Sequence, residues 1–389
     1  MGRHVVIYSD DPDKGGVAQY NHRVALALEA SGLRVSIVQS RSTGGMVALR
    51  ESRGIAHWWI PYDTGREFAR TLTEAGDAER AFGELRPDLV LFSDCCPVSN
   101  MAAKHTAIRL GIPHVVVVHF VAQYLAQRFS GQLRLLAQMY AAARCVVAVS
   151  GENLEQLGRL FGLPPGKGRV VFNGVAPKFF QPRSEPNRGD LRRRLGIPEG
   201  TVLSLTTARL SAVKLHLLQV AAMEVLAREA PSTRIRCVWA GEGELRQSLE
   251  SEISRRGLQE RFHLVGQISD VEPWYDAADV FTLTSESEGM PLSIMEAMAK
   301  GLPVVATAVS GIPEELGREG ALLPDPAKDA MGAVTTLART WIDWSRKPGL
   351  REGVGRRCRQ RAEALFREET MMRNTLDYIE EAMATAAAV

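Results

Sequence analysis

The chain has 389 residues, of which 45% are hydrophobic and 24% are charged. These are the proportions of a globular protein, and they exclude a disordered or collagen-like chain. A length well above the ~100–200 residues of one ordinary domain predicts two domains. The 47 Lys and Arg residues nearly balance the 45 Asp and Glu residues and leave a net charge of +2, which argues against a protein dedicated to nucleic acids.

The five cysteines include no CxxC pair; they are Cys95, Cys96, Cys145, Cys237 and Cys358. This odd set indicates neither a disulfide framework nor a zinc ribbon, so we expect a reducing compartment. The apolar run at residues 5–8 is too short for the core of a signal peptide. No stretch reaches the ~20 apolar residues of a membrane-spanning helix. We therefore expect a cytoplasmic protein.

Short runs rich in Val, Ile and Leu alternate with longer segments of helical spacing, a pattern typical of parallel sheets covered by helices. In the first half we expect the helix Ala18–Ala30, which ends before Gly32, and five strands: His4–Tyr8, Val35–Gln39, Leu89–Phe92, His114–Val118 and Val146–Ser150. In the second half the expected strands are Val202–Thr206, Ile235–Ala240, Phe262–Val265, Val280–Thr284 and Val304–Thr307. Both halves are therefore predicted to be α/β domains.

The segment from Pro177 to Asn187 contains three prolines, which interrupt any helix or central strand. We place the linker there, so that residues 1–180 form the first domain and the second begins at residue 181.

Positive charge is concentrated in residues 101–180, which contain nine bases and two acids. A basic face of this kind could meet phosphates, an acidic acceptor or an anionic membrane surface. Arginines scattered over solvated helices would give the same count, so both interpretations remain open.

The stretch from Thr282 to Gly301 predicts a strand, a polar loop and a helix, because Pro291 suits a first helical turn and Gly301 suits a helix end. Ligands of open parallel sheets bind at the carboxyl ends of the strands, and the unpaired amides of a following helix favour an anion. We therefore expect the loop at Gly289 and Met290 to bind a phosphate.

Two carboxylates flank the start of this helix, with Glu288 in the loop and Glu296 inside the helix. Each also has an ordinary interpretation: Glu296 could form an (i, i+4) ion pair with Lys300, and Glu288 could be a solvated loop acid.

Two cations, Arg209 and Lys214, follow the carboxyl end of the predicted strand Val202–Thr206. A guanidinium and an ammonium that converge there would hold a diphosphate without a metal ion. The alternative is that both are solvated loop cations.

Together these residues resemble the paired signatures of the family-4 retaining glycosyltransferases. Four residues separate Arg209 from Lys214, and seven separate Glu288 from Glu296. Further similar segments are Phe172-Asn-Gly-Val175, Ala240-Gly-Glu-Gly-Glu244, Leu264-Val-Gly266 and Ser310-Gly-Ile-Pro-Glu-Glu315. The resemblance is strong over residues 200–316 and looser before residue 180. It departs from the family at Ala208 and Leu215, where members often have glycine.

The resemblance implies the GT-B fold, an α/β architecture of two Rossmann-like domains that face each other across a cleft. It implies a second, nucleotide-sugar-binding domain over residues 181–368 and a C-terminal helix at residues 369–389 that returns to the first, acceptor domain. Apolar residues between Phe366 and Met383 suffice for one buried helical face.

The activity that the resemblance implies is transfer of a sugar from a nucleoside-diphosphate sugar, by default a UDP-sugar, to an acceptor hydroxyl with retention of configuration. The acceptor would be a small molecule or a lipid-linked saccharide, and no metal ion or other cofactor would be required. A peripheral position at the inner membrane face would suit the basic residues 101–180.

The resemblance also implies roles for single residues. Arg209 and Lys214 would neutralise the departing diphosphate, Glu288 would contact the donor sugar and Glu296 would hold the ribose hydroxyls. His119, at a strand end, would lie near the transferred sugar, although a lone histidine is more often structural. The other donor-binding residues would be Gly15, Gly16, Gly241, Gly266, Gln267, Ile268, Gly289, Met290, Pro291 and Leu292.

The segment Asp10–Tyr20 follows the first predicted strand and precedes a helix. Gly15 and Gly16 allow the backbone to approach a ligand closely, although a Gly-Gly pair alone most often marks a turn. Asp10, Asp11 and Asp13 could form a metal site or an acceptor base, but Asp-rich turns are common, and we expect no metal site.

Two other functions remain open, because a fold does not by itself determine function. One is a nucleotide-sugar epimerase or hydrolase, which would convert the donor without an acceptor. The other is a non-catalytic nucleotide-sugar-binding or scaffold protein, which would show no turnover.

Overall fold

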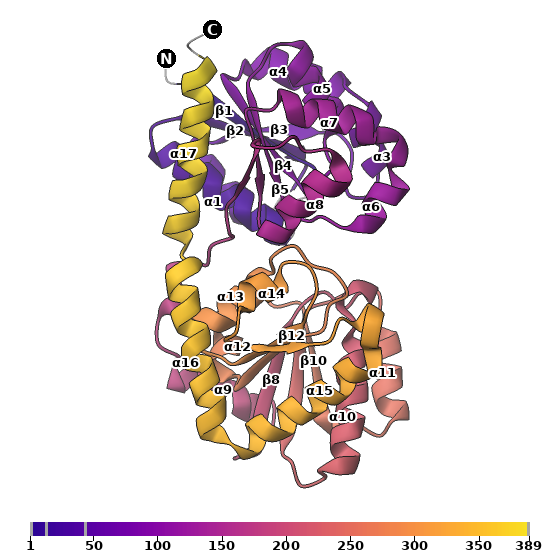
Figure 1. Cartoon of the computed structure of the whole chain (residues 1–389). Coiled ribbons are helices and arrows are strands. Elements are labelled where there is room, and N and C mark those ends of the chain that lie inside the picture. The colour runs from indigo at the N-terminus through magenta and orange to yellow at the C-terminus, as the bar shows by residue number, and fades with distance from the viewer. Residues whose placement is uncertain (1–2, 12–14, 43–44, 387–389) are drawn as a thin grey trace. The chain divides into compact units, whose positions relative to one another are not determined.

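The structure is a computed structural model that describes residues 3–11, 15–42 and 45–386. The chain divides into two compact units, which Figure 1 shows with many of their elements labelled. Unit 1 comprises Met1–Asn173 together with Glu369–Val389, and unit 2 comprises Gly174–Glu368.

Unit 1 contains a parallel sheet of seven strands in the order β3-β2-β1-β4-β5-β6-β7. The strands are β1 (His4–Ser9), β2 (Arg34–Ser40), β3 (Ala56–Ile60), β4 (Leu89–Asp94), β5 (His114–Val118), β6 (Cys145–Ala148) and β7 (Gly168–Val170). All neighbours pair in parallel. The carboxyl ends of the strands therefore meet at one edge of this sheet.

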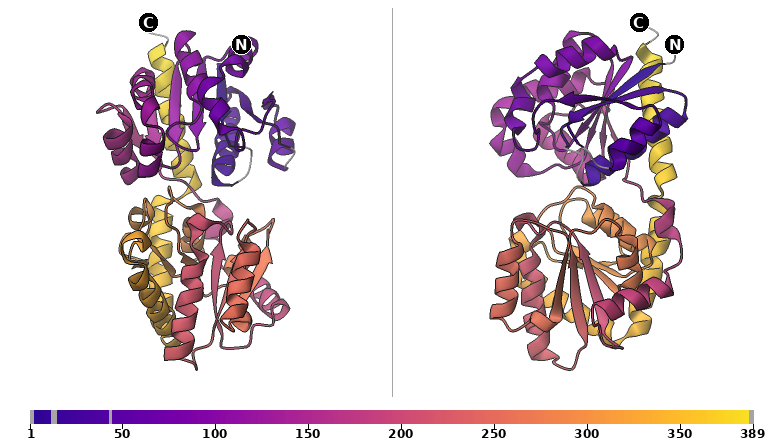
Figure 2. Two further views of the ribbon diagram at one scale, coloured as in Figure 1. Left: turned by 90° about the vertical axis from the view of Figure 1, so that its right-hand side faces the viewer. Right: turned by 180° about the vertical axis from the view of Figure 1, so that it is seen from behind.

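Helices cover both faces of this sheet (Figure 2). They are α1 (Gly16–Ala30), α2 (Gly45–Ser52), α3 (Phe68–Thr73), α4 (Gly76–Leu85), α5 (Met101–Arg109), α6 (Gln123–Arg128), α7 (Leu133–Ala142), α8 (Gly151–Phe161) and α17 (Glu368–Ala386). Side chains alternate between the faces along β1. Val6 and Tyr8 belong to the core under α4, α5 and α7, whereas Val5 and Ile7 belong to the core that α1 and α17 cover.

Unit 2 contains a second parallel sheet, of six strands in the order β10-β9-β8-β11-β12-β13. The strands are β8 (Val202–Thr207), β9 (Ile235–Ala240), β10 (Phe262–Gly266), β11 (Val280–Leu283), β12 (Val304–Thr307) and β13 (Ala321–Leu323). The helices are α9 (Glu185–Arg194), α10 (His216–Glu229), α11 (Arg246–Arg255), α12 (Glu272–Ala277), α13 (Leu292–Ala299), α14 (Ile312–Leu316), α15 (Pro326–Arg346) and α16 (Pro348–Leu365). Helix α10 packs against α15, and α13 packs against α16.

The predicted α/β class is confirmed, and every predicted strand is present. The strands that the sequence analysis missed are β3, β7 and β13, and all three lie at sheet edges. An edge strand has a neighbour on one side only, so it is less buried and carries a weaker apolar signal. Both β7 and β13 are also only three residues long.

The prediction of a linker at Pro177–Asn187 is wrong, because this segment folds as part of unit 2. Pro177 starts a 3₁₀ turn, Pro177–Phe180, whose Phe179 and Phe180 are buried. Pro186 lies in the first turn of α9. Amides in a first turn have no partner within the helix, so proline loses no hydrogen bond there. The chain passes between the units earlier, at Asn173 and Gly174.

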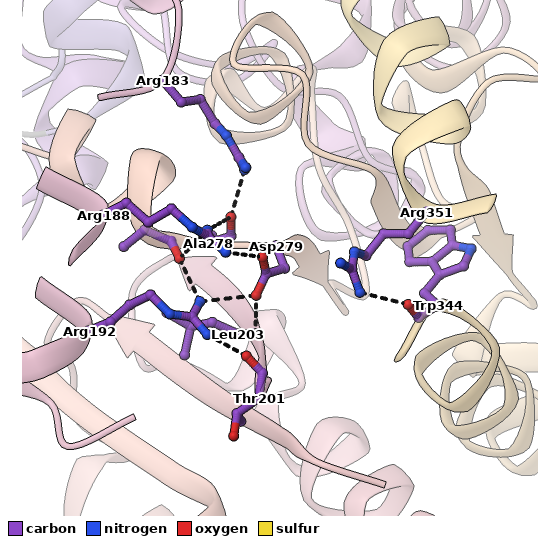
Figure 3. Close-up of polar contacts among 10 residues, drawn as sticks. Arg183, Arg188, Arg192, Thr201, Leu203, Ala278, Asp279, Trp344 and Arg351 are labelled. Carbon is purple, nitrogen blue, oxygen red and sulfur yellow. Dashed lines mark hydrogen bonds and ion pairs between the residues drawn. The ribbon is translucent and has the colours of Figure 1, made fainter. Parts of the chain in front are cut away.

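Three arginines attach this entering segment to unit 2 (Figure 3). Arg183 and Arg188 donate to the carbonyl oxygen of Ala278, at 2.7 and 3.2 Å. Arg188 and Arg192 also bind the two carboxylate oxygens of Asp279, at 2.7 and 3.0 Å. Burial favours the neutral form of Asp279, but these two arginines outweigh it and lower the pKa of Asp279 below its ordinary value.

The two places where the chain enters and leaves unit 2 lie side by side. The amide of Val175 donates to the carbonyl of Phe366 at 2.8 Å, and the amide of Glu368 donates to the carbonyl of Val175 at 3.2 Å. A Cβ atom on Gly174 would lie 2.6 Å from the Cα of Glu368. Only glycine allows the two segments to approach this closely.

Among the described residues, no helix is both long enough and apolar enough to cross a lipid bilayer.

Candidate active site

The loops that follow β8, β11 and β12 bring Lys214 and Glu288 into direct contact. Glu288 Oε1 accepts hydrogen bonds from the ammonium of Lys214 and the hydroxyl of Ser285. Its amide donates to Ser310 Oγ at 3.2 Å. Glu288 is 9% exposed, so the interpretation of this residue as a solvated loop acid is wrong, as is that of Lys214 as a solvated loop cation.

Backbone bonds hold the Lys214 loop against the loop after β11. The amide of Glu286 donates to the carbonyl of Val213 at 2.8 Å, and Thr284 Oγ1 lies 3.2 Å from the carbonyl oxygens of both Lys214 and Leu215. Leu215 has the left-handed conformation, with φ 44° and ψ 42°, which glycine adopts without strain. Leu215 therefore keeps the backbone turn at this position, where family members often have glycine.

Arg209 lies on the same edge of the sheet and is exposed. Its neighbours continue the pairing of β8 with β9: the amide of Ala208 donates to the carbonyl of Ala240, and that of Leu210 to the carbonyl of Glu242. The side chain of Arg209, between these two paired residues, is exposed. Within the described part of the chain, its guanidinium has no recorded partner, so it remains able to bind an anion.

The glycines at the end of β9 have a packing role. A Cβ on Gly241 would lie 2.0 Å from the carbonyl oxygen of Ala208, and one on Gly243 would lie 2.3 Å from that of Leu210. Close backbone packing therefore explains Gly241 without a ligand. Gly266 has φ 79° at the end of β10, and it is followed by the exposed Gln267 and the half-buried Ile268.

Glu296 points toward α12 rather than toward Lys300. Its Oε2 atom accepts a hydrogen bond from the hydroxyl of Tyr275 at 2.8 Å. Lys300 instead binds two carboxylates of α12, Glu272 at 2.7 Å and Asp276 at 3.0 Å. The predicted alternative of an ion pair between Glu296 and Lys300 is therefore wrong.

The start of α13 carries neither a side-chain cap nor an acid in its first turn. Gly289, the buried Met290 and Pro291 lead into this helix, and Leu292 is its first residue. The free amides of such a first turn favour an anion. This arrangement fits the expected phosphate-binding loop.

A second carboxyl group, that of Glu315 in α14, lies near Glu288 and is fully buried. The backbone amide of Met295 favours the ionised form of its carboxyl group, but less strongly than burial disfavours that form. Burial first, and then the charge of Glu288, raises the pKa of Glu315 well above its ordinary value. The raised pKa favours the neutral acid form of Glu315.

In unit 1, Gly15 and Gly16 begin α1. Gly15 has φ 105°, a conformation that side-chain-bearing residues rarely adopt, and a Cβ there would meet no atom within 4 Å. Both glycines are exposed, and the first turn of α1 has no acid and no side-chain cap. Like α13, this helix presents free amides to an anion.

His119 follows β5, as predicted, and is buried. Its Nε2 atom lies 3.0 Å from Ser93 Oγ, and its ring meets that of Tyr20 edge-on at 4.7 Å. Burial lowers the pKa of His119 to about 3, so the imidazole is neutral at physiological pH.

The sequence analysis missed a polar network beside His119 at the carboxyl edge of this sheet. Asp94, the last residue of β4, binds Lys104 Nζ and Asn100 Nδ2, and Asp94 and Lys104 are both fully buried. Burial raises the pKa of Asp94 to about 7, with Lys104 opposing the rise. The signal in the sequence was Asp94, a polar residue at the end of a buried apolar strand. The sequence analysis counted its partner, Lys104, among the bases of a possible basic face.

Asp10 belongs to the same edge and accepts hydrogen bonds from the hydroxyl of Ser99 and the amide of Cys95. The predicted Asp cluster cannot be assessed as a whole, because Asp13 lies outside the described residues. Residues 3–11, 15–42 and 45–386 contain no group of three His, Cys, Asp or Glu side chains that could hold a metal ion.

Both halves of the chain match known family models. Residues 14–179 match the model described as "Glycosyltransferase Family 4", and residues 202–339 match the one described as "Glycosyl transferases group 1". The chain belongs to this family of glycosyltransferases. Together the two matches contain all the predicted site residues, with Gly15 at one end and Glu296 toward the other.

A relative with an assigned activity is the D-inositol 3-phosphate glycosyltransferase of Streptomyces avermitilis, which is 30% identical over 71% of this chain. The chain spans 62% of the length of that relative. Its fold is similar to that of Anabaena HepE in complex with UDP-glucose, with a TM-score of 0.79, 18% identity and coverage of 97% and 99% of the two chains. It is also similar to sucrose-phosphate synthase from Thermosynechococcus elongatus, with a TM-score of 0.80, 19% identity and coverage of 98% and 100%. These solved structures share the GT-B fold that the resemblance implies.

Proposed function

We propose that this protein transfers a sugar from a nucleoside-diphosphate sugar, first of all a UDP-sugar, to an acceptor hydroxyl with retention and without a metal ion. The observation that carries the proposal is the convergence of Lys214 and Glu288 at the sheet edge where Arg209 is exposed. A cation beside a carboxylate supplies both kinds of group that a charged leaving group and a polyhydroxylated sugar need. The printed name of the Streptomyces relative supports an inositol phosphate as the first acceptor to test.

In this reaction the bond between the sugar carbon and the diphosphate oxygen breaks, and the diphosphate leaves with the electron pair. The acceptor oxygen bonds to the same carbon, and its proton passes overall to the diphosphate. Lys214 uses one ammonium hydrogen on Glu288 and has two more for the diphosphate. The guanidinium of Arg209 adds a second cation, so protein charges supply the electrostatic stabilisation that a metal ion supplies elsewhere.

The test begins with thermal shifts in the presence of UDP, GDP and ADP, because a ligand that binds only the native state raises the melting temperature. The matching sugar nucleotide is then incubated with and without myo-inositol phosphate, and NMR reads the anomeric configuration of the product. We expect the same configuration in donor and product, and undiminished turnover in EDTA. An inverted product would contradict retention, and loss of activity in EDTA that Mg²⁺ or Mn²⁺ restores would contradict the metal-free site.

The same experiment separates the alternatives. Rapid conversion of the donor without acceptor would favour an epimerase or hydrolase. Nucleotide binding without turnover on any acceptor would favour a binding protein.

We further propose that the protein works in the cytoplasm and touches an anionic membrane through α6 and α7. Not all of the basic residues in 101–180 can serve there, because Lys104 is buried against Asp94, Arg109 pairs with Glu79, and Lys178 lies in unit 2. Residues 95–151 contain no acid, and this segment exposes Tyr124, Leu135, Arg128 and Arg134. Exposed apolar and basic side chains together suit an anionic lipid surface.

Sedimentation with phosphatidylglycerol vesicles tests the membrane contact, with phosphatidylcholine vesicles as the control. We expect binding to the anionic vesicles only, weakened by salt and by the double substitution Arg128→Glu and Arg134→Glu. Equal binding to both kinds of vesicle, or to neither at low salt, would contradict the proposal.

A further inference from the structure

Tyr275 lies at the meeting point of three elements next to Glu296. The side chain is fully buried. Its hydroxyl lies 2.8 Å from Glu296 Oε2, 2.9 Å from Thr207 Oγ1 and 3.2 Å from the carbonyl oxygen of Ser293. The phenol thus joins α12 to the end of β8 and to the first turn of α13.

The hydrogen-bond donors in this cluster can be assigned from the groups present. The phenol has one proton to donate, and Glu296 and the Ser293 carbonyl both accept, while the hydroxyl of Thr207 can donate to the phenol oxygen. The carboxylate is the closer acceptor and the charged one, so it accepts the hydrogen bond of the phenol. Burial first, and then the charge of Glu296, raises the pKa of Tyr275 well above its ordinary value, so the phenol keeps that proton.

The same helix α12 also removes the cation that would compete for Glu296. Lys300 is four residues from Glu296, within reach of an (i, i+4) ion pair. Its ammonium is held by Glu272 and Asp276 of α12, and it is almost fully buried between them. Glu296 therefore accepts a hydrogen bond from the neutral phenol of Tyr275, while Lys300 pairs with α12.

A carboxylate is suited to a pair of neighbouring hydroxyl groups. Each hydroxyl of a ribose diol donates one hydrogen bond, and an ionised carboxylate only accepts. Rotation of the Glu296 side chain would spoil such a two-point contact, and the short bond to Tyr275 opposes that rotation.

We propose that Tyr275 is a positioning residue that holds Glu296 in the orientation that binds the ribose diol of the donor nucleotide. The inference rests on the proposed function, because Glu296 contacts a ribose only if the chain binds a nucleotide. Tyr275 itself contacts no ligand and acts only through Glu296.

The experiment compares UDP with 2′,3′-dideoxy-UDP in isothermal titration calorimetry on the full chain. Tyr275→Phe retains the buried ring and removes only the hydroxyl. We expect this substitution to weaken UDP binding about tenfold, the usual effect of a lost hydrogen bond to a charged group. Dideoxy-UDP, which lacks the diol, should bind the wild type and Tyr275→Phe with affinities within about twofold of each other.

A double-mutant cycle provides the second measurement. Glu296→Gln should weaken UDP binding, and adding Tyr275→Phe to it should weaken binding no further, because both changes remove the same interaction. The control is Tyr140→Phe, another fully buried tyrosine, which lies in unit 1 and donates to the carbonyl of Pro97 at 3.3 Å. It should bind UDP as the wild type does.

Three results would overturn the inference alone: unchanged UDP affinity in Tyr275→Phe, equal weakening of UDP and dideoxy-UDP, or full additivity with Glu296→Gln. The second of these would indicate a general structural role of the tyrosine. A wild-type chain that binds none of UDP, GDP and ADP would instead overturn the proposed function, and the inference with it.

Discussion

At the scale of single residues, the two candidate diphosphate ligands have different surroundings. Arg209 is exposed, whereas the side chain of Lys214 is only 21% exposed and pairs with Glu288. An exposed cation contributes little to folding stability, but removal of one partner of a buried pair leaves an uncompensated charge. Substitution at the two positions should therefore differ in its effect on stability.

We predict that Arg209→Ala lowers turnover by about 10²–10³, the usual loss when one preorganised charge at a developing anion is removed, and leaves the urea-unfolding midpoint unchanged. Lys214→Ala should lower turnover similarly and also lower the unfolding midpoint. The matched control is Arg234→Ala, an exposed arginine directly before β9, at the opposite end of that strand. Wild-type turnover in both variants would contradict the assigned diphosphate site.

Glu315 should make the stability of unit 2 depend on pH. Its pKa is raised in the folded state, so above its ordinary pKa the unfolded chain releases a proton that the folded chain retains. The contribution of Glu315 to the free energy of unfolding is complete below pH ~4 and declines as the pH rises above that value. Glu315→Gln cannot ionise, so its unfolding midpoint should fall less between pH 5 and pH 8 than that of the wild type.

Glu260→Gln serves as the control for this titration, because the side chain of Glu260 is 93% exposed. Parallel pH profiles for the wild type and Glu315→Gln would show that Glu315 ionises normally in the folded chain.

At the scale of elements, polar groups gather at the carboxyl edges of both sheets. Lys214, Glu288 and Ser310 follow β8, β11 and β12, while Asp10, Asp94 and His119 end or follow β1, β4 and β5. Parallel strands force this arrangement, because all of them end at the same edge. The apolar strands place these groups together although the chain separates them widely.

The paired segments at Val175 and Arg367 depend on Gly174. A Cβ there would also lie 3.0 Å from the carbonyl oxygen of Arg367, so Gly174→Ala requires the backbone to shift. We expect it to lower the free energy of unfolding by about 1–3 kcal/mol, as overpacking does elsewhere. Chemical denaturation measures this loss.

Gly83→Ala is the matched control for Gly174→Ala, because Gly83 lies in α4 and a Cβ there would meet no atom within 4 Å. The control should be neutral or stabilising by up to about 1 kcal/mol. A Gly174→Ala variant as stable as Gly83→Ala would show that the two segments are not held together.

At the scale of the whole molecule, the chain has two compact units, and the C-terminal helix belongs to the first. Met371, Ile379 and Met383 of α17 are buried in one cluster with Val5 and Ile7 of β1. Two units of this kind are expected to unfold in separable steps rather than in one two-state transition.

We predict that Ile379→Ala lowers the free energy of unfolding of unit 1 by about 2–5 kcal/mol, the usual cost for a buried isoleucine, and leaves the transition of unit 2 unchanged. Ile253→Ala, in α11, should lower only the transition of unit 2, because Ile253 is 4% exposed there. Scanning calorimetry of both variants tests this. If Ile379→Ala moved the same transition as Ile253→Ala, the assignment of α17 to unit 1 would fail.

The sequence alone determined the α/β class, all the central strands and the positions of the candidate ligand groups in their loops. This was possible because a strand buried on both faces must be apolar along its length, and because ligand groups must follow strand ends. Edge strands such as β3 and β7 escaped prediction, since one of their sides has no neighbour and their burial is incomplete.

Only the tertiary structure decided which side chains pair. Lys300 and Tyr275 were both available to Glu296, and local spacing along the helix favoured Lys300. The packing of α12 against α13 reversed that choice, because α12 brings two carboxylates to Lys300 and a phenol to Glu296. Contacts between residues distant in sequence depend on how whole elements pack, and pairwise spacing along one helix carries no information about them.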